Sequence, residues 1–140
     1  MARSVLVDAG FLVALLSQRD GNHAWAAEQG ERLPPPWRTC EAVLSEAFHL
    51  LGVRGGPGLA ALVRRRAVTL SFDLGKDIEP VLKLMQRYSS VPMSLADACL
   101  VRMSEVLADP MVLTTDGDFR IYRRNGRQVV PCLTPQESST

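Results

Sequence analysis

Short apolar runs alternate with longer, partly apolar segments along this chain. The first run, 4–7, ends at the carboxylate Asp8 and is followed by a longer apolar stretch, 11–16. A short continuous apolar run is typical of a buried strand, and the longer stretch is typical of a helix that packs on the sheet. The same pattern predicts further strands at 37–39, 67–72, 111–114 and 128–130, and further helices at 22–32, 40–51, 59–66, 73–88 and 95–107.

Turn-forming residues separate these segments. The glycine-rich stretch 52–58, the pair 109–110 (Asp-Pro) and the pair 125–126 (Asn-Gly) each predict a turn. Because strands alternate with helices, we expect an α/β sandwich around a mostly parallel sheet. We expect a single domain over residues 1–133 and a polar, disordered tail over residues 134–140.

The composition narrows the class of protein. The chain has 140 residues, of which 46% are hydrophobic, and a formal net charge of +1, so it suits one folded domain without a strongly basic or acidic surface. No stretch approaches the roughly 20 apolar residues that a membrane span needs. Cys40, Cys99 and Cys132 are far apart and form no zinc-binding pattern. Their odd number and the lack of a signal-peptide pattern predict a cytoplasmic protein.

Four acidic residues recur beside predicted strands or apolar helix faces. Asp8 follows the first predicted strand, and Asp116 follows the fourth. Glu46 lies at the edge of an apolar helix face, and Asp97 lies in the first turn of a later helix. Each position has a structural interpretation, since acidic residues also cap helices and favour their first turns. The functional alternative is that they meet at the carboxyl ends of the strands, where open α/β sheets bind ligands.

A cluster of carboxylates at that edge would have a definite chemistry. Partly desolvated like charges raise one another's pKa, and a cation among them relieves the repulsion. Oxygen-only ligand sets select hard cations such as Mg²⁺ or Mn²⁺. Such ions activate water and stabilise a leaving oxygen, which is the chemistry of phosphodiester hydrolysis.

Several stretches resemble the PIN-domain family, and most closely the VapC-type toxins of bacterial toxin–antitoxin pairs. The most specific are 94–98, Ser-Leu-Ala-Asp-Ala, and 113–119, Leu-Thr-Thr-Asp-Gly-Asp-Phe. The opening stretch 5–8 and Glu46 in the third predicted helix agree with it. The resemblance extends from Ser4 to about Leu133. It implies a three-layer α/β/α sandwich with a parallel central sheet.

The resemblance further implies a metal-dependent endoribonuclease. The positions of the family's acidic quartet, which binds Mg²⁺ or Mn²⁺ around an attacking water, match Asp8, Glu46, Asp97 and Asp116. Asp118 matches an additional acidic position, and Thr114 matches a hydroxyl that supports the site. The expected partners are an RNA substrate, a cognate antitoxin protein that blocks the acidic groove, and a second copy of the chain in a homodimer.

A basic cluster follows the last acidic motif. We expect Arg120, Arg123 and Arg124 to contact an RNA backbone beside the cation, because contacts of this kind position a strand without reading its sequence. The alternative is that these arginines are solvated residues of a helix end and a loop.

One departure from the family pattern keeps other functions open. Ala9 and Gly10 stand where the family often has Thr or Ser followed by a small polar residue, so a hydrogen bond that supports the first carboxylate is expected to be missing. A PIN fold that binds RNA or protein without cutting therefore remains an alternative. An aspartate-nucleophile phosphatase fits less well, since it needs a second Asp at the position of Gly10. A phospho-receiver needs an acidic pair in the first loop and a Lys after a late strand, and neither is present.

Overall fold

Five parallel strands form the central sheet of the computed structural model, which describes residues 2–135. Their order across the sheet is β3-β2-β1-β4-β7, and every neighbouring pair is parallel. The strands are β1 (Ser4–Val7), β2 (Trp37–Thr39), β3 (Val68–Leu70), β4 (Pro110–Leu113) and β7 (Cys132–Leu133). The first strand is central because its residues are apolar and buried along their whole length.

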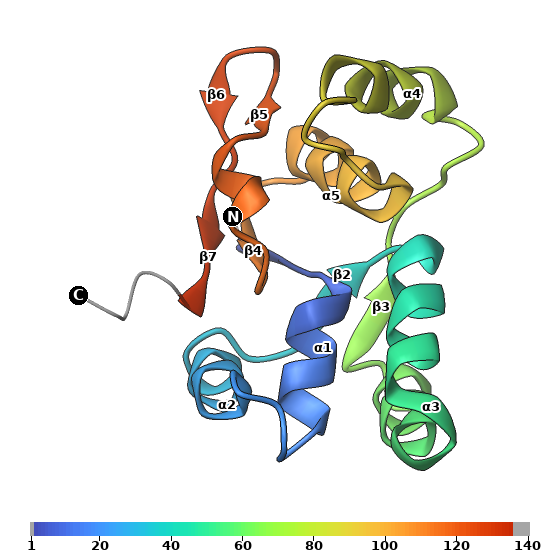
Figure 1. Cartoon of the computed structure of the whole chain (residues 1–140), viewed down its shortest axis with the longest axis vertical. Helices are drawn as coiled ribbons and strands as arrows, with labels where there is room; N and C mark the ends of the chain where they lie inside the picture. The colour runs from blue at the N-terminus through green and yellow to red at the C-terminus, as the bar shows by residue number, and fades with distance from the viewer. Residues whose placement is uncertain (1, 136–140) are drawn as a thin grey trace.

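Helices cover both faces of this sheet. They are α1 (Ala9–Leu16), α2 (His23–Arg32), α3 (Glu41–Arg64), α4 (Ile78–Arg87), α5 (Leu95–Val106) and the 3₁₀ helix η1 (Gly117–Arg120). The helix α1 packs against α2 and α3, while α4 packs against α5, which contacts β1 and β4. Figure 1 shows α1 and α2 on one side of the sheet and α4 and α5 on the other. The predicted α/β sandwich with a mostly parallel sheet is therefore confirmed.

The core lies between the sheet and these helices. Its largest fully buried side chains come from β1, α1, α3, α5, β4 and the segment after β4: Leu6, Phe11, Leu12, Leu59, Leu100, Met103, Leu113, Phe119 and Tyr122. Phe119 and Tyr122 pack edge to face, with ring centroids 5.3 Å apart. Within residues 2–135, no helix combines the length and apolar character needed to cross a membrane.

The predicted turn at 52–58 is wrong in extent. The structure has one element, α3, broken only at Gly52, where φ is 67° and ψ is −163°. The helix resumes directly afterwards and includes Gly55, Gly56 and Pro57. Pro57 lies five residues after the break, early in the new segment, and its missing N–H costs this segment one helical hydrogen bond. Four glycines so close together predicted a loop, although only Gly52 leaves the helical conformation.

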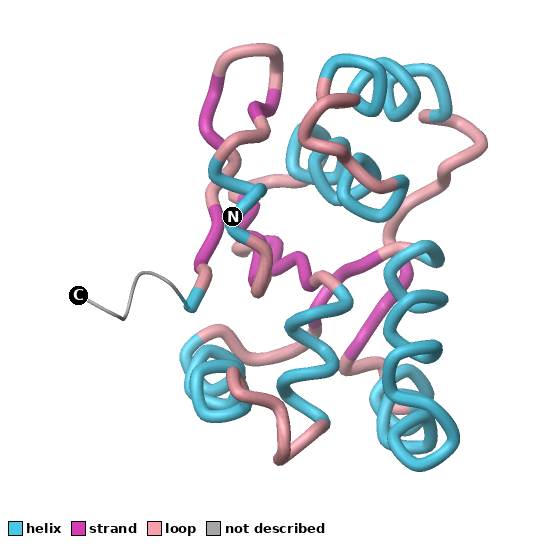
Figure 2. Tube along the Cα trace, viewed as in Figure 1, coloured by secondary structure: helices cyan, strands magenta, loops and turns pink. Residues whose placement is uncertain are grey.

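The predicted final strand at 128–130 is also misplaced. Residues Gln128–Val129 form β6, which pairs antiparallel with β5 (Arg123–Arg124) in a separate hairpin. The predicted turn between them is confirmed, since Asn125 and Gly126 both have positive φ. The fifth strand of the main sheet is β7 instead, and its two residues are too few to show an alternating pattern. Figure 2 shows the hairpin as a pair of short strands beyond the sheet.

One further helix boundary differs from expectation. The helix α4 begins at Ile78, because residues 74–77 form a turn instead of the start of the predicted helix. At the other end, Thr134 of the predicted tail is buried and its hydroxyl accepts a hydrogen bond from Arg120. Residues 136–140 of that tail lie outside the described residues, so the predicted boundary at 133/134 stays a prediction.

Candidate functional site

The register between β1 and β4 builds the candidate site. Val7 pairs with Leu113 in this parallel ladder, so the next residues of both strands, Asp8 and Thr114, emerge at the same carboxyl edge of the sheet. The Asp8 N–H donates to the carbonyl of Leu113 at 3.2 Å and extends the ladder by one step. In open α/β sheets this edge is where ligands bind.

Asp8 is a buried carboxylate with both oxygens hydrogen-bonded. Its side chain is only 7% exposed and caps α1, accepting a bond from the Phe11 N–H at 2.8 Å on Oδ1. Its Oδ2 accepts a bond from the Thr114 hydroxyl. Burial raises the pKa of Asp8 to about 7, against the opposing effect of these two bonds, and the charges of Asp97 and Asp116 raise the pKa further. The capping interpretation of Asp8 is thus correct, and the residue also shares a charged site.

Thr114 connects Asp8 to the segment after β4. Its hydroxyl donates to Asp8 and accepts a hydrogen bond from the Asp116 N–H at 2.9 Å. Asp116 in turn caps η1, with its Oδ1 accepting from the Asp118 N–H at 2.9 Å. Thr114 therefore fixes the spacing between the first and fourth residues of the expected quartet, at the position where a supporting hydroxyl was expected.

Asp97 reaches the same edge from α5. Asp97 is the third residue of the helix and forms a capping box with the N-cap Ser94. The Asp97 N–H donates to the Ser94 hydroxyl at 3.0 Å, and the Asp97 Oδ2 accepts a hydrogen bond from the Ser94 N–H at 3.3 Å. The hydroxyl of Tyr122 also donates to Oδ2, at 3.1 Å. Burial raises the pKa of Asp97, these hydrogen bonds lower it in part, and the charge of Asp116 raises it again. Charge interactions therefore link Asp97 to both Asp8 and Asp116.

Glu46, the remaining member of the expected quartet, differs from these three aspartates in its exposure. Its side chain is exposed on α3, and the charges that raise the pKa of Asp8 come from Asp97 and Asp116. Within residues 2–135, no three His, Cys, Asp or Glu side chains converge closely enough to enclose a metal ion. The place of Glu46 in the quartet stays a prediction, as does the role of the quartet as a ligand set.

The departure at Gly10 has a structural counterpart in Thr115. A Cβ atom built on Gly10 would lie 2.0 Å from the Thr115 hydroxyl oxygen and 3.6 Å from Oδ1 of Asp8. The hydroxyl of Thr115 therefore occupies the space beside Asp8 that a polar side chain at position 10 would fill. The expected loss of support for the first carboxylate is also offset, because Thr114 and the Phe11 N–H already satisfy both of its oxygens.

The three arginines expected at an RNA backbone all have partners within the chain. Arg120 donates to the Thr134 hydroxyl, and Arg123 donates to three backbone carbonyls of the segment 120–122. Arg124 donates twice to the carbonyl of Ser104, at 3.0 and 2.5 Å, and once to Gln128. These bonds brace the segment that carries Asp116 and Asp118. A contact between these arginines and RNA stays a prediction.

Tyr122 is the residue at this site that sequence reasoning did not single out. It is fully buried, and its pKa is raised by burial and then by the nearby charge of Asp97. In the sequence, Tyr122 follows Phe119 at a spacing of three residues, which is typical of side chains packed in a hydrophobic core. The only available sign was its position shortly after the acidic motif.

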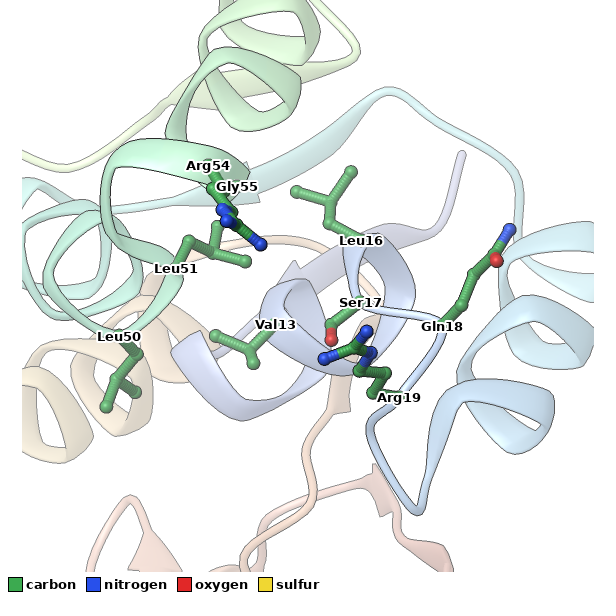
Figure 3. A pocket seen from close by; sticks show the side chains of 9 residues that line it. All are labelled: Val13, Leu16, Ser17, Gln18, Arg19, Leu50, Leu51, Arg54 and Gly55. Carbon is green, nitrogen blue, oxygen red and sulfur yellow. The ribbon is translucent and has the colours of Figure 1, made fainter.

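One cavity of the structure is separate from this acidic edge. It has a volume of about 440 Å³ and lies between the end of α1 and the break in α3. Figure 3 shows its apolar side chains together with two arginines, Arg19 and Arg54. No carboxylate lines it, so the predicted metal ligands belong to a different part of the surface.

Comparisons with known proteins agree with this architecture. Among solved structures, the crystal structure of Mycobacterium tuberculosis VapC20, described as a sarcin-ricin loop cleaving toxin, is similar with a TM-score of 0.67 and 25% sequence identity. The match covers 82% of this chain and 92% of the VapC20 chain. No curated protein matches the sequence. The model of the PIN domain matches residues 5–125, and this chain therefore belongs to the PIN domain family.

Proposed function

We propose that this chain is a Mg²⁺- or Mn²⁺-dependent endoribonuclease, and that it is the toxin of a type II toxin–antitoxin pair. The observation that carries the proposal is that Asp8, Asp97 and Asp116 lie at the starts of three helices, α1, α5 and η1, where the charges of Asp97 and Asp116 act on Asp8. The similarity to the VapC20 toxin supports RNA as the substrate class. An antitoxin partner, a homodimer and a cytoplasmic location are further parts of this proposal, which the resemblance to VapC-type toxins implies.

The donor chemistry of the site fits a hard divalent cation. All the candidate ligands are carboxylate oxygens, which is the donor type that Mg²⁺ and Mn²⁺ prefer. Among the described residues, Asp97 Oδ1 and Asp116 Oδ2 accept no hydrogen bond, so each carboxylate keeps one oxygen for a ligand. We assign the cation to Asp8, Asp97 and Asp116, with Glu46 and Asp118 as further ligands. When bound, the cation would activate a water and offset the negative charge of the phosphate.

Hydrogen bonds within the chain fix the positions of the three aspartates before any cation binds. Thr114 keeps Asp8 and Asp116 in register, and the capping bonds of α1, α5 and η1 fix the direction of each carboxylate. Burial raises the pKa of Asp8, and the charges that act on it among the described residues, those of Asp97 and Asp116, are negative. A positive charge beside Asp8 favours the ionised form, which makes this edge selective for cations.

Cleavage of total cellular RNA by the purified protein tests the proposal. We expect discrete products with Mg²⁺ or Mn²⁺ and none with EDTA. Asp97→Asn removes a ligand charge without changing the side-chain volume, and Asp8→Asn does the same. Each is expected to lower cleavage by more than about 100-fold, beyond the 10–100-fold typical of residues that only support a ligand.

Asp109→Asn provides a matched control for these substitutions. Asp109 is exposed, lies before β4 at the opposite edge of the sheet, and has a φ of 45° that asparagine tolerates well. Its ion pair with Arg3 is exposed and contributes little to stability. We expect Asp109→Asn to cleave at the wild-type rate. Full cleavage by Asp97→Asn, with an unchanged circular dichroism spectrum, would refute the assignment of the aspartates.

A PIN fold that binds RNA without cutting is the second candidate. Two observations favour it: Ala9 and Gly10 lack polar side chains, and among residues 2–135 the carboxylates do not form a closed coordination shell. The same assay separates the two functions. A non-cleaving module would shift RNA in a gel without producing new ends at any cation concentration.

A further inference from the structure

Tyr122 joins two of the acidic residues at the sheet edge. Its hydroxyl donates to Asp97 Oδ2 at 3.1 Å, and its backbone N–H donates to the carbonyl of Asp118 at 3.2 Å. The segment after η1 is thereby tied to the first turn of α5.

The two oxygens of the Asp97 carboxylate have different surroundings. Oδ2 accepts two hydrogen bonds, from Tyr122 and from the Ser94 N–H, whereas Oδ1 accepts none from the described residues. A carboxylate anchored through one oxygen has a fixed plane and presents the other oxygen in a fixed direction. Such partners orient metal ligands in many proteins.

The Tyr122 ring is itself held rigidly. It is fully buried and packs edge to face against Phe119 and Tyr88, with ring centroids 5.3 and 5.1 Å away. The Tyr88 hydroxyl accepts a hydrogen bond from the Arg123 N–H at 2.9 Å, which fixes the backbone next to Tyr122. A tyrosine hydroxyl is protonated at neutral pH, so that of Tyr122 acts as the donor to the Asp97 carboxylate.

We propose that Tyr122 is the positioning residue of Asp97: its hydroxyl occupies Oδ2 and thereby leaves Oδ1 as the oxygen that binds the divalent cation. This inference rests on the proposed function, because it concerns the cation that the aspartates would hold. It assigns the role to a residue outside the acidic motifs, and it predicts a loss of cation affinity when a single hydroxyl is removed.

The test is Mn²⁺ binding to the full-length protein without RNA, measured by electron paramagnetic resonance of the free ion. Tyr122→Phe keeps the ring and removes only the hydroxyl, and we expect it to weaken the Kd for Mn²⁺ by about 10–100-fold. We expect cleavage of RNA by this variant to recover as Mn²⁺ is raised. Recovery of this kind separates a loss of affinity from a loss of folded protein.

Tyr88→Phe is the matched control. It removes the hydroxyl of the neighbouring buried ring, whose partner is the Arg123 N–H instead of a carboxylate. We expect Tyr88→Phe to lower the melting temperature while leaving the Kd for Mn²⁺ within about twofold of wild type.

The outcomes distinguish this inference from the proposed function. If the wild type binds Mn²⁺ and cleaves RNA but Tyr122→Phe binds Mn²⁺ equally well, the role of Tyr122 is refuted and the nuclease stands. Equal weakening in Tyr88→Phe and Tyr122→Phe would likewise refute it, because the effect would then come from packing. If the wild type neither binds Mn²⁺ nor cleaves RNA, the proposed function fails and the inference fails with it.

Discussion

Asp8 carries two roles that make opposite demands on one carboxyl group. As the N-cap of α1 it is buried and accepts hydrogen bonds from the Phe11 N–H and the Thr114 hydroxyl. As a member of an acidic group it is close enough to Asp97 and Asp116 for their charges to raise its pKa. The cap alone would favour the ionised form, while burial and the neighbouring charges favour the neutral form. The balance places its pKa at about 7, near the pH at which the protein would act.

This pKa has a consequence for stability in the absence of divalent cations. Between its ordinary pKa of 3.8 and about 7, the folded chain holds a proton on Asp8 that the unfolded chain releases. The stability contributed by this group is therefore complete below about pH 4 and is lost as the pH rises through 7. The loss amounts to at most about 4 kcal/mol.

Asp8→Asn is expected to reduce this pH dependence, because an amide has no charge to bury. In EDTA the variant should match the wild type near pH 4 and unfold at a higher urea concentration near pH 8. Urea denaturation at both pH values measures the difference. If the stability of the two proteins changed equally between pH 4 and pH 8, the assigned pKa of Asp8 would be contradicted.

At the scale of elements, the break in α3 and the caps of the short helices determine where the acidic residues point. The break at Gly52 separates the part of α3 that carries Glu46 from the part that packs near the end of α1. Each of the three aspartates begins a helix or lies in its first turn, so local capping geometry directs its side chain.

Because of the break, substitution by alanine is expected to have opposite effects on stability at two nearby glycines, Gly52 and Gly56. Gly52→Ala should lower the free energy of unfolding by about 1 kcal/mol, because φ is 67° there and a side chain disfavours that conformation. Gly56→Ala should raise the free energy by up to about 1 kcal/mol, since Gly56 is helical and its nearest contact is 3.7 Å away. Urea denaturation of both variants measures this. Equal changes in both would show that the break is absent in solution.

At the scale of the whole molecule, the parallel sheet brings the distant acidic segments together. Residues 8, 97 and 116 are far apart in the chain, and the order β1-β4 together with the packing of α5 on both strands places them at one edge. Before a cation binds, this edge holds like charges that repel one another. The site is therefore expected to gain stability when a cation neutralises it.

Divalent cations should accordingly stabilise the entire fold by mass action. At a free Mn²⁺ concentration of 100 times its Kd, we expect a gain of about 2.7 kcal/mol in the free energy of unfolding. The gain should disappear in Asp97→Asn and persist in Asp109→Asn. Thermal unfolding with and without Mn²⁺ measures it, and an equal gain in both variants would point to binding elsewhere on the chain.

Much of this architecture was predictable from local patterns. The run 4–7 is short and mostly apolar, which is typical of a buried strand. Ser94, followed three residues later by Asp97, is a capping pattern that predicts the start of α5. The strand β7 and the continuation of α3 beyond Gly52 were not predictable in this way. The partner of β7 is supplied by β4 nearly 20 residues earlier, and the conformation of each glycine depends on packing instead of on residue type.

The sequence by itself determined the α/β alternation, the family and the identity of the acidic residues, because these depend on local periodicity and on short motifs. Only the tertiary structure decided that the charges of Asp97 and Asp116 act on the buried Asp8 and that Glu46 is exposed on α3. It alone also decided that the Tyr122 hydroxyl meets Asp97 and that Thr115 fills the space beside Gly10. The physical reason is that burial, pKa and hydrogen-bond partners depend on contacts between residues far apart in the chain, which the order of residues does not display.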